Sequence, residues 1–175
     1  MKKIVLTFGL ISGFISAALM GIMLPMVLSG KIDFERSEIA GYASIVLSCL
    51  LIFFGIRSYR ENVGGGAVTF GKAFIVGLLI TVISCVVYVA AWEFIYIRFT
   101  PDFYEKYTAH TLARMLEKGE SAAAIAATRK KMTDFKVMYD NPFLNAAFTF
   151  MEPFPIGLAV TLISAAILRK KPSPA

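Results

Sequence analysis

Two acidic side chains and one basic side chain lie in or beside apolar stretches of this 175-residue chain, where chemistry would concentrate. Glu93 and Arg98 are near the end of one long apolar run, and Glu152 lies inside another. A charge that deep in an apolar helix is costly, so each side chain should face a partner, a cavity or water. The three residues are predicted to form a polar cluster within the membrane. It is either a structural ion-pair network or a site for a proton or a cation, because two close carboxylates raise the pKa of one of them.

Two prolines follow Glu152 directly and predict a break in its helix. Pro153 and Pro155 lack backbone N–H donors and should push Glu152 itself out of helical conformation. In one arrangement, residues 141–151 lie in the membrane interface and Glu152 caps a short helix that begins at Pro153. In the other, a single helix spans the membrane and its break exposes backbone carbonyls to a cavity, as in transporters.

The other reactive side chains lack the neighbours that chemistry requires. Cys49 and Cys85 lie in apolar runs, where burial keeps a thiol inert. His110 is the sole histidine and the only candidate base for a membrane enzyme, and no second metal ligand is near it. The glycine-rich segment 57–72 departs from the phosphate-binding spacing and predicts a flexible turn ended by a Thr69 cap. We therefore expect no catalytic residue, no metal site, no cofactor and no enzymatic activity.

The composition is that of an integral membrane protein. Hydrophobic residues make up 57% of the chain, charged residues 17%, and the mean hydropathy is +0.69. Soluble domains are about 45–50% apolar and about 25% charged. These values exclude a water-soluble globule and a disordered chain, and two cysteines exclude a disulfide scaffold.

Four apolar runs are long enough to cross a bilayer, which takes roughly 20 helical residues. The first run also resembles a signal peptide. The apolar core of a signal peptide is roughly 7–15 residues long, and this run is longer, so it is interpreted as a retained helix. We expect an all-α fold: one membrane domain over residues 1–175, a four-transmembrane-helix bundle with an extramembrane helical hairpin between the third and fourth helices. The predicted spans are residues 4–28, 39–56, 73–97 and 143–168, and the hairpin is residues 100–141.

Helix-start and helix-stop residues define the hairpin. Thr100 is predicted to cap its first helix with Pro101 at the first position, and Gly119 to end that helix. The second helix is predicted from about Ser121 to Asn141. Both are amphipathic, so the hairpin would cap the bundle or lie on the membrane surface.

The basic residues predict the orientation, because they favour the cytoplasmic side. With a cytoplasmic N-terminus, that side holds Lys2, Lys3, Arg57, Arg60, Lys72, Arg169, Lys170 and Lys171. The long third loop, which contains Arg129, Lys130 and Lys131, departs from the rule. We expect an inner-membrane protein with both termini in the cytoplasm, and a net charge of +6 that serves lipid headgroups rather than nucleic acid.

Small residues recur every four positions along the first span, at Gly9, Gly13, Ala17 and Gly21. Such a stripe lets membrane helices approach closely. It predicts packing within the bundle or against a partner, either a second copy of this chain or another membrane protein.

A segment of the third span is repeated in the fourth. Residues 69–78 align without gaps on residues 149–158, and the match continues to Thr81 and Thr161. Consecutive spans run in opposite directions, so the pair would be an inverted repeat, a pattern typical of transporters.

Five short motifs resemble those of a bacterial multi-pass membrane family catalogued as domain of unknown function 4199. They are GIRSYR at 55–60, TFGKA at 69–73, NPF at 141–143, EPFPIG at 152–157 and RKK at 169–171. The resemblance implies four membrane helices, a helical insertion before the last, and no assigned activity or catalytic residue. Our first hypothesis is a non-enzymatic structural or partner-binding protein. The alternative is a small oligomeric transporter, coupled to protons or ions, that uses a carboxylate in its broken fourth helix.

Overall fold

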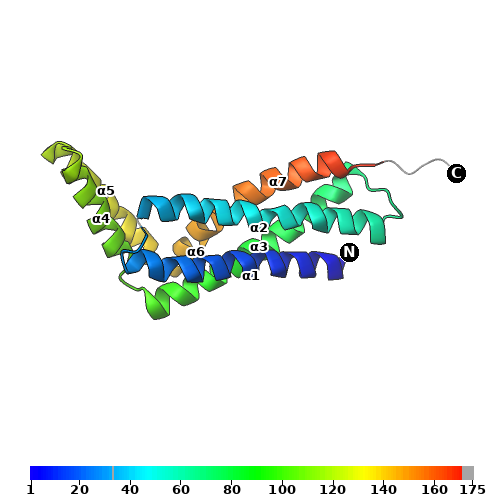
Figure 1. Cartoon of the computed structure of the whole chain (residues 1–175), viewed down its shortest axis with the longest axis horizontal. Coiled ribbons are helices and arrows are strands. Elements are labelled where there is room, and N and C mark those ends of the chain that lie inside the picture. The colour runs from blue at the N-terminus through cyan, green and yellow to red at the C-terminus, as the bar shows by residue number, and fades with distance from the viewer. Residues whose placement is uncertain (33, 171–175) are drawn as a thin grey trace. The chain divides into compact units, whose positions relative to one another are not determined.

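The computed structural model describes residues 1–32 and 34–170, which form helices joined by short turns and loops (Figure 1). Lys171, expected among the cytoplasmic basic residues, lies outside this range. The chain divides into two compact units, Met1–Ala91 with Phe150–Ala175, and Trp92–Thr149. The helices of the described residues are α1 (Lys2–Leu28), α2 (Phe34–Asn62), α3 (Phe70–Phe99), α4 (Phe103–Glu117), α5 (Ala122–Tyr139), α6 (Pro142–Met151) and α7 (Pro153–Leu168).

Four segments of these helices are long and apolar enough to cross a membrane. They are α1, α2, α3 and the stretch Pro142–Leu168 that contains α6 and α7. The described residues thereby confirm the all-α fold and four helical segments that are long and apolar enough to cross a membrane. Most helices extend beyond the predicted runs, because backbone hydrogen bonding continues into polar residues where the apolar stretch ends.

Four buried serines join α1, α2 and α3 inside the first unit. The Ser12 hydroxyl donates to the backbone carbonyl of Ser48 at 2.9 Å, and the Ser16 and Ser48 hydroxyls lie 2.6 Å apart. From α3, Ser84 donates to the Ser12 oxygen at 3.0 Å. In hydrocarbon no water replaces a missing partner, so these contacts specify how the three helices pack.

A reciprocal contact between glycine and threonine joins α3 to α7. A Cβ atom on Gly77 would lie 2.7 Å from the Thr161 methyl carbon, and one on Gly157 would lie 2.5 Å from that of Thr81. The two threonine hydroxyls are 3.1 Å apart at the centre. Each threonine therefore fills the space left by a glycine on the other helix.

This contact relates the two copies of the predicted repeat. Gly77 contacts Thr161, the counterpart of Thr81, and Thr81 contacts Gly157, the counterpart of Gly77. The helices α3 and α7 therefore cross antiparallel with local two-fold symmetry. Matching ring pairs accompany the crossing: Phe70 stacks on Phe74, and Phe150 on Phe154.

The small residues of α1 divide into two groups. Gly9 and Gly13 lie against α3, where added Cβ atoms would come within 2.8 Å of Ile83 and 2.6 Å of Val87. Ala17 is half-buried, and no atom lies within 4 Å of a Cβ built on Gly21. The first two glycines thus serve contact between helices of this unit.

In the second unit α4 and α5 lie against each other. The Lys136 ammonium is 3.2 Å from the Glu105 carboxylate, and the rings of Tyr104 and Phe135 stack with centroids 5.9 Å apart. The turn between the helices is as predicted: Gly119 has a positive φ of 72°. The second helix follows a Ser121 cap, whose hydroxyl accepts from the Ala124 N–H at 3.2 Å.

Two predicted details of helix ends are wrong. Thr100 does not cap α4: its carbonyl accepts from the Phe103 N–H at 3.0 Å, so a turn comes first and Asp102 is the N-cap. Glu152 keeps helical dihedrals, φ −71° and ψ −58°. The break between α6 and α7 follows instead from the N–H donors that Pro153 and Pro155 lack.

We expect the reciprocal crossing to be sensitive to one added carbon atom. Gly157→Ala should lower the free energy of unfolding by about 1–3 kcal/mol, because the new Cβ overlaps Thr81. Unfolding in mixed detergent micelles, followed by far-UV circular dichroism, would measure this.

Gly41→Ala is the matched control, because a Cβ there meets no atom within 4 Å. Adding Thr81→Ala to Gly157→Ala should restore part of the loss. Equal stability of the two alanine variants would contradict the crossing.

Candidate functional site

Three aromatic side chains with hydrogen-bond donors lie four residues apart on α3. Tyr88, Trp92 and Tyr96 therefore share one face of the helix. Each donates to an oxygen acceptor from the part of the chain that follows the α4–α5 hairpin turn. We call these three donor–acceptor pairs the aromatic ladder; its first pair lies in the first unit and the other two in the second unit.

The first pair of the ladder holds the carboxylate at the helix break. The Tyr88 hydroxyl donates to Glu152 Oε2 at 3.1 Å. Glu152 is the N-cap residue of α7, yet its side chain makes no capping hydrogen bond there. The carboxylate therefore turns toward α3, and it lies on the exposed surface of the first unit.

The second pair is a buried network in the second unit. The indole N–H of Trp92 donates to Asn145 Oδ1 at 3.1 Å, and the Thr149 hydroxyl donates to the same oxygen at 3.2 Å. The Asn145 amide donates in turn to the Tyr139 carbonyl at 3.1 Å. Asn145 is only 1% exposed, and this set of contacts satisfies both ends of its amide.

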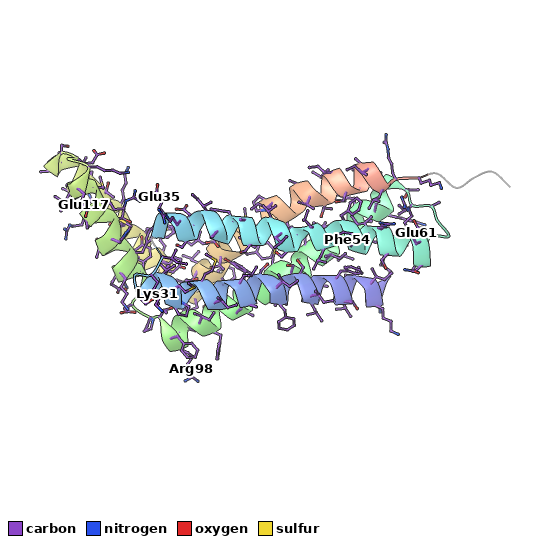
Figure 2. All side chains as sticks on the ribbon, viewed as in Figure 1. Lys31, Glu35, Phe54, Glu61, Arg98 and Glu117 are labelled. Atoms are coloured by element: carbon purple, nitrogen blue, oxygen red, sulfur yellow. The ribbon has the colours of Figure 1, made fainter. Side chains whose placement is uncertain are left out.

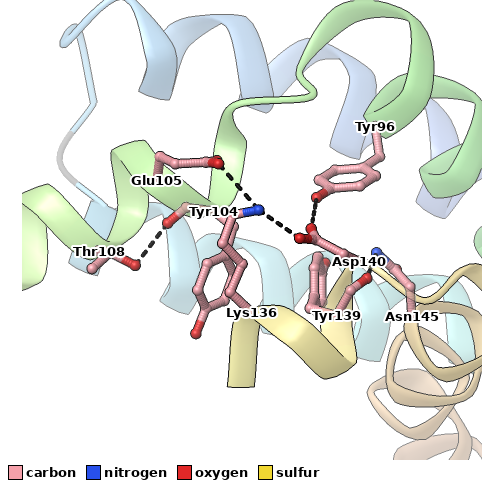
Figure 3. Close-up of polar contacts among 8 residues, drawn as sticks. All are labelled: Tyr96, Tyr104, Glu105, Thr108, Lys136, Tyr139, Asp140 and Asn145. Carbon is pink, nitrogen blue, oxygen red and sulfur yellow. Dashed lines mark hydrogen bonds and ion pairs between the residues drawn. The ribbon is translucent and has the colours of Figure 1, made fainter. Parts of the chain in front are cut away.

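The third pair begins a chain of polar contacts onto the hairpin (Figure 3). The Tyr96 hydroxyl donates to Asp140 Oδ1 at 3.4 Å, and Lys136 donates to Asp140 Oδ2 at 2.6 Å. Lys136 also reaches Glu105 on α4. Hydrogen bonds to Asp140 and Glu105 raise the pKa of Lys136, so this ion-paired lysine stays protonated at neutral pH.

The residues of the predicted cluster lie in different units. Glu93 and Arg98 belong to the second unit and Glu152 to the first. Glu93 Oε1 is buried and has no hydrogen-bond partner in the described part of the chain. Arg98 is exposed, and its side chain extends away from its helix (Figure 2). Joint action of the three residues stays a prediction.

The aromatic ladder was not predicted, although its spacing was present in the third apolar run. Tyr88, Trp92 and Tyr96 recur at a four-residue interval, which places three polar tips on one stripe of a membrane helix. Their acceptors follow no fixed offset, so only the fold brings them together.

The chemistry open to this arrangement is binding, positioning and proton exchange. Among residues 1–32 and 34–170, no three histidine, cysteine or acidic side chains are grouped so as to hold a metal ion. Cys49 and Cys85 are both buried as free thiols. The ladder pairs donors with acceptors, and Glu152 is its one exposed carboxylate in the first unit.

Comparison with known proteins identifies a family. The family model described as "Protein of unknown function (DUF4199)" matches residues 7–170. No curated protein and no solved structure matches the chain. The match agrees with the resemblance carried by the five sequence motifs.

We expect Asn145→Leu to destabilise the second unit by about 1–3 kcal/mol, because it leaves the buried Trp92 N–H without its acceptor. Trp92 is the only tryptophan, so its fluorescence emission should shift in the folded variant. Denaturant titration followed by this fluorescence measures both effects.

Asn62→Leu serves as the control, since the Asn62 amide is exposed and donates its hydrogen bonds to Ser58, one turn earlier in the same helix. Equal stability of the two variants together with unchanged emission would contradict a structural role for the Trp92–Asn145 pair.

Proposed function

We propose that this chain, which belongs to the DUF4199 family, is a non-enzymatic membrane protein whose four spans hold the α4–α5 hairpin for a protein partner to bind. The observation that carries the proposal is the apolar surface of the hairpin. The hairpin is packed by its own ion pairs and rings, and it still exposes large apolar side chains.

The exposed apolar surface centres on Leu116, which is 65% exposed. Leu116 lines two shallow grooves on the hairpin, of about 660 and 510 Å³. Ile125 lines the larger one, and Arg129 lines both. An apolar centre with a charged rim is typical of protein interfaces, so the partner should offer an apolar side chain to Leu116.

We further propose that the hairpin lies outside the membrane and that both termini are in the cytoplasm of a bacterial cell, with the spans in its inner membrane. Exposed charges on both hairpin helices support an aqueous location, because hydrocarbon does not accommodate them. The basic residues of the first unit lie mainly at the end where α1 begins, which supports a cytoplasmic N-terminus.

A photo-cross-linking residue at position 116 of the full chain, expressed in its own host, tests partner binding. We expect one adduct of defined mass from position 116 and far less from position 117, an exposed neighbour that lines neither groove. Mass spectrometry of the adduct identifies a protein partner, or a second copy at twice 19.2 kDa.

The substitution Ile125→Asp places a charge in the larger groove and should abolish the adduct while the helical content is retained. Lipid adducts only, equal yields at the two positions, or an adduct that survives Ile125→Asp would each refute the proposal.

A second candidate, the small oligomeric transporter coupled to protons or ions, is favoured by the Tyr88–Glu152 pair at the helix break. An exposed carboxylate with a phenol donor, inside a membrane-crossing segment, is suited to exchanging a proton or a cation.

Proteoliposomes with a pH gradient test this candidate. If the chain conducts protons, Glu152→Gln should abolish the flux and Tyr88→Phe should reduce it, because the phenol only positions the carboxylate. Flux of the wild type equal to that of Glu152→Gln or of empty vesicles would exclude the transporter.

A further inference from the structure

One end of the first unit gathers positive charge. There α1 and α3 begin and α2 and α7 end (Figure 1). The cations of this basic end are Lys2, Lys3, Arg57, Arg60, Lys72, Arg169 and Lys170. Arg60 forms an ion pair with Glu61 at 2.6 Å, and the other six have no ion pair among the described residues. The labelled Glu61 marks this end of the first unit in Figure 2.

Hydrogen bonds hold in place the segment that carries Arg169 and Lys170. The Val68 N–H donates to the Lys170 carbonyl at 3.0 Å, and the Lys170 N–H donates back to the Val68 carbonyl at 2.9 Å. The Arg60 guanidinium also donates to the Leu168 carbonyl, at 3.4 Å. The segment after α7 is therefore held beside the loop that leads into α3, and Arg169 and Lys170 are not on a free tail.

The loop at this end offers little steric hindrance. Gly65 and Gly66 have positive φ values of 60° and 82°, which glycine adopts readily. A Cβ on Gly64 would overlap the Ala67 carbonyl. Three residues without side chains let the chain reverse tightly after α2 and leave the surrounding cations open to an approaching group.

The depth of the cations matches that of lipid headgroups. The apolar run of α3 begins directly after Lys72, and that of α7 ends at Leu168, directly before Arg169. Arg57 follows the apolar part of α2 in the same way. Cations at the boundary of the hydrocarbon meet the phosphates of the adjacent leaflet.

We propose that the basic end binds the phosphate groups of anionic phospholipid headgroups, with Arg57, Lys72, Arg169 and Lys170 as contact residues. All four side chains are exposed and without an acidic partner in the described chain. Guanidinium and ammonium groups pair with phosphate oxygens through charge-assisted hydrogen bonds. This inference is independent of partner binding by the hairpin.

Native mass spectrometry of the full chain, released from nanodiscs that contain equal parts of phosphatidylglycerol and phosphatidylcholine, tests the proposal. The wild type should retain phosphatidylglycerol preferentially. In the variant Arg57→Gln/Lys72→Gln/Arg169→Gln/Lys170→Gln, the ratio of retained phosphatidylglycerol to phosphatidylcholine should fall about tenfold. If this variant does not fold, Arg57→Gln/Lys72→Gln is measured instead and should show a smaller loss in the same direction.

The matched control removes four exposed cations from the hairpin: Lys118→Gln/Arg129→Gln/Lys130→Gln/Lys131→Gln. It should keep the wild-type preference, as should the charge-preserving variant Lys72→Arg/Lys170→Arg. Loss of preference in the control would show a general charge effect and overturn the site. Displacement of phosphatidylglycerol by inorganic phosphate would show a site for free phosphate and overturn the assignment to lipid.

Discussion

Polar side chains inside hydrocarbon must find their partners within the protein, and this constraint organises the first unit. The Ser12–Ser48, Ser12–Ser84 and Thr81–Thr161 contacts are hydroxyl contacts between helices, and glycines let α1 and α7 approach α3 closely. Lipid tails are as apolar as leucine, so apolar surface alone gives membrane helices no preferred neighbour. In this chain, small residues and hydroxyl groups determine which helices pack together.

The hairpin of the second unit follows a different rule, because α4 and α5 carry charges and pack through aromatic rings. Tyr104, Phe135 and Tyr139 pack between α4 and α5, and Lys136 lies between two carboxylates. Exposed ion pairs add little stability, so the rings account for most of the packing. A hairpin built in this way can vary its surface without disturbing its interior, which suits a binding surface.

Local signals in the sequence predicted the four segments apolar enough to cross a membrane, the turn at Gly119 and the start of the next helix near Ser121, because each depends on residues close together in the chain. The predicted Thr100 cap was wrong because a turn forms before α4 and makes Asp102 the N-cap. The predicted conformation of Glu152 was wrong because a residue before proline can keep helical dihedrals, as Glu152 does. The aromatic ladder escaped prediction because Asn145 and Asp140 meet α3 only through the tertiary fold. The repeat was visible as a sequence match, yet the reciprocal fit of Gly77 and Gly157 against threonines depends on how α3 and α7 cross, which the sequence does not specify.

The first unit is discontinuous, since Phe150 and the residues after it join Met1–Ala91 across an intervening unit. During synthesis, α1, α2 and α3 therefore enter the bilayer before the helix that completes their packing exists. Until α7 emerges, the surface of α3 around Gly77 and Thr81 has no partner helix. The backbone N–H and carbonyl of Val68 likewise lack the Lys170 groups with which they later form hydrogen bonds. Assembly of the first unit must therefore wait until the ribosome has passed residues 92–149, the whole of the second unit.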